Sequence, residues 1–176
     1  KARRVGDPFG DVDQGPQVNA AQFDKVMGYI MRGKEEGATL LTGGARHGTE
    51  GFYVQPTVFA DVTDEMTIAR EEIFGPVMTL LRFSDEEEAI TRANASDYGL
   101  AGGVVTRDLT RAHRVAARIQ TGMFWINTYQ AQPMQIPFGG YKQSGIGRET
   151  HKMMLDHYQQ TKNMLVSYNP NKLGFF

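Results

Sequence analysis

Residues 71–76 combine the kinds of side chain from which a small binding site can be built. Glu71 and Glu72 supply adjacent carboxylates, Phe74 supplies an aromatic ring, and Gly75-Pro76 forms a turn ahead of an apolar run. Glycine gives the backbone freedom at such a turn, and proline fixes φ where the next strand begins. We interpret this stretch as a loop that delivers a carboxylate and a ring to a fixed place. Charged pairs beside turns are also common on solvated surfaces, so the residues alone leave both interpretations open.

The segment ahead of this loop predicts one long amphipathic helix. Asn19 followed by Gln22 is typical of an N-cap with a capping box. The helix is expected to run from about Ala20 to Glu36. Gln22 and Lys25 lie three residues apart and therefore share one of its faces. Its apolar stripe consists of Phe23, Val26, Met27 and Ile30.

After the loop, apolar strands alternate with helices of about ten residues. Ser84 and Glu87 form a Ser-x-x-Glu capping box, which predicts a helix start, and Pro56 indicates that the segment around it is an edge strand or irregular. The alternation predicts an α/β fold of βαβ units with a largely parallel sheet. The expected strands cover 39–42, 53–59, 77–83, 100–106 and 123–127, and the expected helices lie within 61–70, 84–93, 108–120 and 150–158. The helix within 108–120 is expected to bury Leu109, Ala112, His113, Ala116 and Ile119.

The remaining chain contains a long loop and a final strand. Residues 128–147 are rich in Gly, Pro and Gln, and loops of that length are usually functional or interfacial. A strand is expected at 162–168, ahead of a tail that ends in Phe175-Phe176. Two terminal aromatic rings need cover, which we expect another subunit to supply. The chain thus divides into a main body, residues 1–158, and an oligomerisation strand with its tail, residues 159–176.

Composition excludes several classes of function. The 176 residues include 19 Lys and Arg against 20 Asp and Glu, which gives a net charge of −1 and no basic surface for nucleic acid or membrane. No apolar run approaches a membrane span and no signal peptide is present, so a cytoplasmic protein is expected. The chain has no cysteine, hence no thiol nucleophile, and its four histidines are not at zinc spacing. Because the chain begins at Lys1, we expect a fragment or a processed product.

The segment Arg70 to Val77 resembles the cofactor-ribose motif of the NAD(P)-dependent aldehyde dehydrogenases. Further motifs of the C-terminal portion of that family occur in the same order, and together they cover almost the whole chain. The ordered set is far more specific than any single motif. It comprises Val5-Gly6-Asp7-Pro8, Gly15-Pro16, Gln55-Pro56-Thr57-Val58-Phe59, Asn94 to Ala101, Trp125-Ile126-Asn127, Pro137 to Gly145 and Gly147-Arg148-Glu149.

This resemblance implies roles for individual residues. Glu72 matches the acid that binds the nicotinamide-ribose hydroxyls, and a carboxylate suits that task because it can accept from both vicinal hydroxyls. Phe74 matches the ring that packs near the nicotinamide. Gln22 and Lys25 match positions that reach the ribose side of the cofactor. The choice between NAD and NADP is left open, because the ribose-phosphate discriminator lies outside this chain and no G-x-G-x-x-G is present.

The same resemblance places residues of the long loop at the substrate. Asn127 matches a position that orients active-site loops through backbone hydrogen bonds, and Phe138, Tyr129 and Gln130 lie at or near the wall of the aldehyde tunnel. The region 139–149 looks most like the betaine-aldehyde and aminoaldehyde branch, whose cationic substrates suit aromatic walls. In that branch, backbone carbonyls near Lys142 and Gly145 can help hold a monovalent cation between subunits.

The family reaction also requires groups outside this chain. A Cys thiolate attacks the aldehyde, hydride passes to NAD(P)+, and a Glu base activates the water that releases the acid. The resemblance therefore implies that this chain supplies cofactor contacts, tunnel wall and an interface to a homo-oligomeric enzyme, a dimer or tetramer, and is inactive alone. The alternative is a non-catalytic oligomerisation or interaction module derived from that fold.

Overall fold

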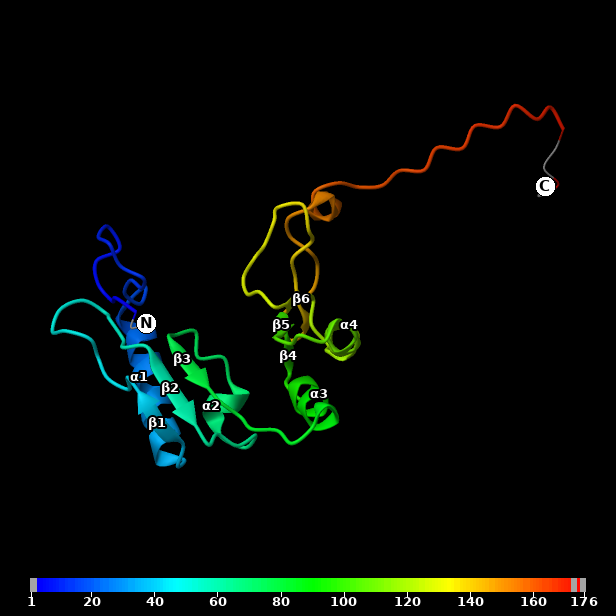
Figure 1. The fold of residues 1–176 in the computed structure, drawn as a ribbon. Helices are drawn as coiled ribbons and strands as arrows, with labels where there is room; N and C mark the ends of the chain where they lie inside the picture. Colours follow the sequence, from blue (N-terminus) through cyan, green and yellow to red (C-terminus); the bar gives the residue numbers. More distant parts are fainter. Residues whose placement is uncertain (1–2, 172–173, 175–176) are drawn as a thin grey trace. The chain divides into compact units, whose positions relative to one another are not determined.

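The computed structural model describes residues 3–171 and 174, and the chain forms two compact units that meet between Ala93 and Asn94 in sequence. No helix in these described residues is long and apolar enough to cross a membrane. In chain order the elements are α1 (Ala20–Glu35), β1 (Thr39–Thr42), β2 (Thr57–Ala60), α2 (Thr67–Arg70), β3 (Val77–Thr79), α3 (Glu86–Asn94), β4 (Tyr98–Gly99), β5 (Ala101–Val104), α4 (Leu109–Arg118), β6 (Met123–Ile126), β7 (Tyr141–Lys142) and the 3₁₀ helix η1 (Lys152–His157) (Figure 1).

Helix α1 forms where the apolar periodicity predicts it. The Asn19 side chain accepts a hydrogen bond of 2.9 Å from the backbone N–H of Gln22, which caps the first turn. Gly37 follows the helix at φ 93°, a left-handed conformation that glycine adopts without a Cβ penalty. Val26 and Ile30 are completely or almost completely buried. The Gln22 side chain, however, does not complete a capping box, because its amide donates to the carbonyls of Ile73 and Phe74 instead.

A three-stranded sheet packs with α1 in the first unit. Strand β2 lies in its middle, antiparallel to β1 and parallel to β3. We expected an edge or irregular strand around Pro56. That expectation is wrong for the residues after Pro56, because β2 begins at Thr57 and is the central strand of the sheet. The Thr57 N–H donates to the Pro76 carbonyl at 2.8 Å. The core shared by these elements contains Val26, Ile30, Ala38, Val54, Phe59, Val62, Ile68 and Ile73.

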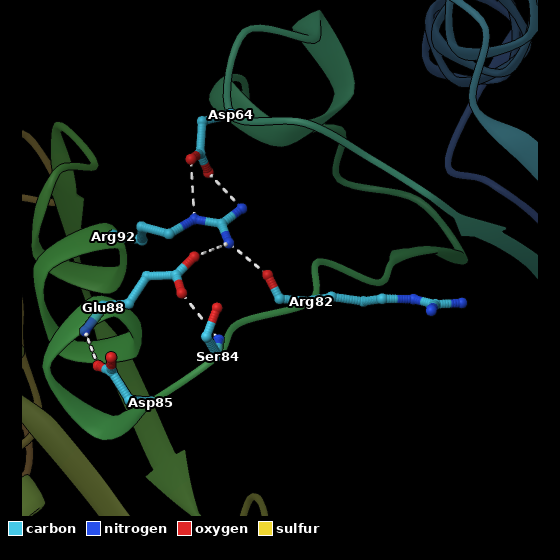
Figure 2. Close-up of polar contacts among 6 residues, drawn as sticks. All are labelled: Asp64, Arg82, Ser84, Asp85, Glu88 and Arg92. Atoms are coloured by element: carbon cyan, nitrogen blue, oxygen red, sulfur yellow. Dashed lines mark hydrogen bonds and ion pairs between the residues drawn. The ribbon is translucent and has the colours of Figure 1, made fainter.

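The cap of helix α3 lies one residue later than predicted. Asp85, not Ser84, accepts from the N–H of Glu88, and the Glu88 carboxylate accepts from the N–H of Ser84 at 2.7 Å (Figure 2). Ser84 and Asp85 are each followed by a glutamate three residues on in Ser84-Asp85-Glu86-Glu87-Glu88, so the pattern could not separate the registers. The bond from the Ser84 backbone is the main reason that the pKa of Glu88 lies below its usual value.

Arg92 ties this helix to the segment ahead of α2. Its Nη2 donates to Asp64 Oδ1 at 3.0 Å, and its Nε forms an ion pair with Asp64 Oδ2 at 2.8 Å (Figure 2). Its Nη1 donates to Glu88 at 3.1 Å and to the carbonyl of Arg82. The Asp64 side chain is the main cause of the raised pKa of Arg92. One guanidinium thus holds three separate backbone segments of the first unit.

The second unit contains the βαβ arrangement that the sequence predicts. Strands β5 and β6 are parallel, with α4 between them in sequence, whereas β4 pairs antiparallel with β7. The chain therefore has several small sheets of mixed direction rather than one largely parallel sheet. On α4 only Ala112 is fully buried, and Leu109 and His113 are exposed, contrary to expectation. A Cβ on Gly122 would lie 1.7 Å from the Gly139 carbonyl oxygen, so only glycine fits that crossing.

The segment after η1 is extended and exposed. Residues 159–171 contain neither helix nor strand, and all of them are exposed. The strand expected at 162–168 does not form, because this segment has no ladder partner among the described residues. Its apolar side chains are open to solvent, with Leu165 at 90% and Tyr168 at 93% exposure. A strand needs a second strand for its backbone hydrogen bonds, and none of the described residues pairs with this segment. Phe175 and Phe176 lie outside the described residues.

Candidate functional site

The loop formed by residues 71–76, which we call the acid–aromatic loop, is fastened to α1 by a side-chain amide. Nε2 of Gln22 donates to the backbone carbonyls of Ile73 at 3.2 Å and Phe74 at 3.0 Å. Two carbonyl acceptors require that the NH₂ end of the amide faces the loop. The hydrogen-bond donors of Gln22 are therefore engaged by the loop backbone.

One turn further along α1, the loop packs directly on the helix. A Cβ on Gly75 would lie 2.5 Å from Cγ2 and 2.7 Å from Cγ1 of Val26, which is completely buried. Non-bonded carbon atoms do not approach that closely, so packing requires glycine at this position. Ile73 turns inward and joins the same core at 8% exposure. The loop is thus seated on the helix by its backbone and by one apolar side chain.

A third contact holds the entry to the loop. The hydroxyl of Tyr29 donates to the Glu71 carboxylate at 2.7 Å, and the ammonium of Lys25 lies 5.7 Å from the centre of the Tyr29 ring. Glu71 is therefore an acid with a structural bond, in line with the surface role expected for it. Tyr29 lies seven residues after Gln22 on the predicted helix, so the helical period could have placed it beside the loop.

Glu72 and Phe74, unlike Ile73, are not part of the core. Both are exposed, Phe74 to 74%, while Ile73 between them is buried. Phe74 adopts φ 54°, which is uncommon for a residue with a side chain. Within the described part of the chain, neither a hydrogen bond nor an ion pair engages the Glu72 carboxylate. The loop held by α1 thus presents an exposed carboxylate and an exposed ring two residues apart.

This arrangement fits the ribose and ring of a nucleotide cofactor. The carboxylate of Glu72 can accept from two neighbouring hydroxyls, and the ring of Phe74 can cover a flat aromatic group. Lys25 is exposed on the same helix as Gln22, with its ammonium above Tyr29. All the residues predicted to contact the cofactor, Gln22, Lys25, Glu72 and Phe74, therefore belong to α1 and the loop that it supports.

In the second unit, Asn127 directly follows β6. Its Oδ1 accepts from the N–H of Thr106 at 2.9 Å and its Nδ2 donates to the Thr106 carbonyl at 2.9 Å. Asn127 has φ 55°, a conformation that asparagine tolerates better than most residues. It also lines a hollow of about 630 Å³ with Val105, Arg107, Leu109 and Ala112. The paired bonds tie the end of β6 to the segment after β5.

The long loop begins with an aromatic pair. The ring of Tyr129 meets that of Trp125 edge to face at 5.4 Å, and the Trp125 indole donates to the Ala131 carbonyl at 2.8 Å. Tyr129 is 75% exposed and Gln130, also exposed, has φ 58°. Phe138 is partly buried, and its backbone exchanges hydrogen bonds with Glu149 at 2.9 and 2.6 Å. An exposed aromatic face is therefore available at Tyr129.

The Lys142 side chain makes structural hydrogen bonds that the sequence patterns did not predict. Its ammonium donates to the carbonyls of Asn94 at 2.7 Å and Ser96 at 2.9 Å, at the C-terminal end of α3. Such a cation complements the partial negative charge at the end of a helix. The Lys142 carbonyl accepts from the Gly145 N–H at 3.4 Å. Among the described residues, no cluster of three or more acidic or histidine side chains could hold a metal ion.

The chain is similar to known proteins over almost its whole length. The model of the aldehyde dehydrogenase family matches residues 1–164. A betaine aldehyde dehydrogenase from Rhizobium etli strain CIAT 652 is 59% identical over 174 residues, which is 97% of this chain and 36% of that protein. One from Brucella ovis is 58% identical over 93% of this chain and 34% of its own length. The chain thus spans about a third of the length of these relatives.

Solved structures give the same pattern. The NAD+ complex of an aldehyde dehydrogenase from Bacillus cereus is 47% identical, with a TM-score of 0.92 over 95% of this chain and 34% of that one. A double mutant of betaine aldehyde dehydrogenase from Staphylococcus aureus, in complex with NAD+, is 40% identical, with a TM-score of 0.91 over 98% of this chain and 36% of that one. The mixed α/β fold seen here is therefore shared with those enzymes.

Proposed function

The chain belongs to the aldehyde dehydrogenase family, and from that premise we propose that it forms part of an NAD+-dependent enzyme that oxidises betaine aldehyde to the acid. Its share of the work is to bind the nicotinamide ribose, to line the substrate tunnel and to join subunits. The observation that carries this proposal is the acid–aromatic loop, which presents Glu72 and Phe74 outward from a fixed seat on α1.

The roles proposed within that site follow from exposure and chemistry. Glu72 accepts hydrogen bonds from the two ribose hydroxyls, and Phe74 packs against the nicotinamide ring. Lys25 and Gln22, both on α1, are assigned to the ribose side of the cofactor. NAD+, when bound, accepts the hydride that oxidation of the aldehyde releases. Relatives solved as NAD+ complexes support NAD+ over NADP+ as the cofactor.

The reacting thiolate must come from the rest of the enzyme, because this chain contains no cysteine. We therefore propose that this chain supplies the nicotinamide-ribose contacts and part of the tunnel wall. The nucleophile lies elsewhere in the full-length protein. We assign Asn127 the task of holding the segment after β5 beside the tunnel, through its paired bonds to Thr106. Phe138, Tyr129 and Gln130 are assigned to the tunnel wall.

A cationic substrate is favoured by the aromatic face at Tyr129. A quaternary ammonium group is attracted to the face of an aromatic ring, and the Trp125 ring packs against the exposed Tyr129 ring. The relatives reported above as betaine aldehyde dehydrogenases support the same substrate. The exposed segment 159–171 is proposed to pair with another subunit of a homo-oligomer, which would supply the missing strand partner.

The test is a kinetic comparison of the full-length enzyme on betaine aldehyde, an aminoaldehyde and a simple aliphatic aldehyde, each with NAD+ and with NADP+. We expect the highest kcat/KM for betaine aldehyde with NAD+. Replacing Tyr129 by Leu should raise the KM for betaine aldehyde about tenfold, since a desolvated cation–π contact contributes about 1–2 kcal/mol, and should leave the aliphatic KM nearly unchanged. Equal effects on both substrates, or no turnover of betaine aldehyde by the parent enzyme, would overturn the substrate assignment.

A further inference from the structure

Gln22 faces the acid–aromatic loop with the donor end of its amide. Nε2 donates both to the carbonyl of Ile73 and to that of Phe74, at 3.2 and 3.0 Å, so the donor nitrogen of the amide is engaged by the loop backbone. A direct bond from this nitrogen to a ribose hydroxyl would require that one of these bonds be broken. The geometry therefore gives Gln22 a task that does not need contact with the cofactor.

The task concerns Phe74, whose backbone is unusual. A φ of 54° is uncommon for a bulky residue and persists only where the surroundings enforce it. The Phe74 carbonyl is one of the two that Gln22 holds. The next residue, Gly75, lies against Val26, and Glu71 ahead of the loop is bonded to Tyr29. The contacts occur at spacings of four and three residues along α1, so they come from one face of the helix.

We propose that Gln22 is a positioning residue: it acts on cofactor binding through the loop, by fixing the backbone that carries Glu72 and Phe74, and not by donating to the cofactor. This inference rests on the proposed function, because it takes Glu72 and Phe74 as the cofactor contacts. The chain contains a second example of the same device, since the Lys142 ammonium holds the carbonyls of Asn94 and Ser96. In both places one side-chain nitrogen fastens two backbone carbonyls of a neighbouring segment.

The test uses the full-length enzyme with Gln22→Met and Gln22→Lys. Methionine keeps the length and removes the donors, whereas lysine restores donors without any acceptor atom. Asp24→Asn, at an exposed position on the same turn of α1, is the matched control. Two quantities are measured: hydrogen exchange of the loop without cofactor, and KM and kcat with NAD+. The reporting amides are those of Val77, which donates to the Gly75 carbonyl, and of Thr57, which donates to the Pro76 carbonyl.

For Gln22→Met we expect about tenfold faster exchange at these amides and about a tenfold higher KM for NAD+, as the loss of two ordinary hydrogen bonds predicts, with the aldehyde KM unchanged. Gln22→Lys should recover most of both effects, and Asp24→Asn should match the parent. If Gln22→Met does not fold, Tyr29→Phe gives a second arm, because it removes one hydroxyl that holds Glu71 and should shift both quantities in the same direction.

A raised KM with unchanged loop exchange would mean that Gln22 contacts the cofactor directly, and would overturn the proposal. Faster exchange with an unchanged KM would also overturn it, since the loop would then be loosened without consequence for binding. The exchange measurement is made without cofactor, so it stands even if Glu72→Gln binds NAD+ normally. That separate result would remove the proposed ribose contact and leave the seating of the loop as measured.

Discussion

Gly75→Ala tests the seat of the acid–aromatic loop most severely. The added Cβ would lie 2.5 Å from Val26 Cγ2, 2.7 Å from Cγ1 and 3.2 Å from Cβ. Carbon atoms in contact prefer about 3.5–4.0 Å, so the loop and α1 must separate by about 1 Å. Val26 is completely buried and cannot turn away. Overpacking of this kind costs about 1–3 kcal/mol, which is roughly a 5- to 150-fold change in the opening equilibrium.

The assay is native-state hydrogen exchange in the full-length enzyme, read at the Thr57 amide, which donates to the Pro76 carbonyl beside the loop. We expect its opening free energy to fall by the amount above and the KM for NAD+ to rise. Gly28→Ala is the matched control: Gly28 lies on α1, and no atom lies within 4 Å of the position that an added methyl group would occupy. That substitution should stabilise the helix by about 0.5–1 kcal/mol.

A double-mutant cycle with Val26→Ala gives the decisive comparison. Val26→Ala removes the two methyl groups that the new Cβ would meet, so the pair Val26→Ala and Gly75→Ala should be less destabilised than the sum of the single changes, by about 1 kcal/mol or more. Strictly additive effects would refute the reasoning, because they would show that the loop does not touch α1 at this point.

Two further predictions concern other parts of the chain. Glu88 has a lowered pKa, chiefly because the Ser84 N–H donates to its carboxylate, so it stabilises the folded chain above the ordinary glutamate pKa of about 4.3 and loses that contribution as the pH falls through the lowered value. Thermal unfolding of Glu88→Gln should therefore begin below the parent at pH 6 and converge with it in the acid range; parallel curves at all pH values would contradict this. Deletion of residues 162–176 should reduce the oligomer to smaller species in light scattering, because the exposed segment would no longer pair across subunits, and an unchanged mass would refute that role.

Local features of this fold follow from the sequence because short-range chemistry decides them. Helix α1 has its cap at Asn19, its apolar stripe and its terminating Gly37, and it forms within one residue of the predicted bounds. The start of α3 is ambiguous because Ser84 and Asp85 are both good caps with a glutamate three residues on. In the structure the cap is Asp85, and Glu88 bonds to Ser84 and Arg92.

Long-range pairing could not be predicted in the same way. The order β1-β2-β3, with one antiparallel and one parallel neighbour, depends on contacts between distant segments that no local pattern encodes. The acid–aromatic loop was found from its residues and from the family motif. The helical period puts Tyr29 on the same face as Gln22, but the bonds of both residues to the loop depend on the long-range packing of α1 against it.

We propose that Glu72, and not its neighbour Glu71, binds the cofactor ribose. Calorimetric titration of NAD+ into full-length Glu72→Gln and Glu71→Gln tests it directly. Hydrogen bonds to a charged group contribute about 1.5–3 kcal/mol, so Glu72→Gln should weaken NAD+ binding by about 10- to 150-fold. Glu71→Gln retains an acceptor for the Tyr29 hydroxyl and should change the Kd by less than about threefold. An unchanged Kd in Glu72→Gln, or an equal loss in both variants, would contradict the account.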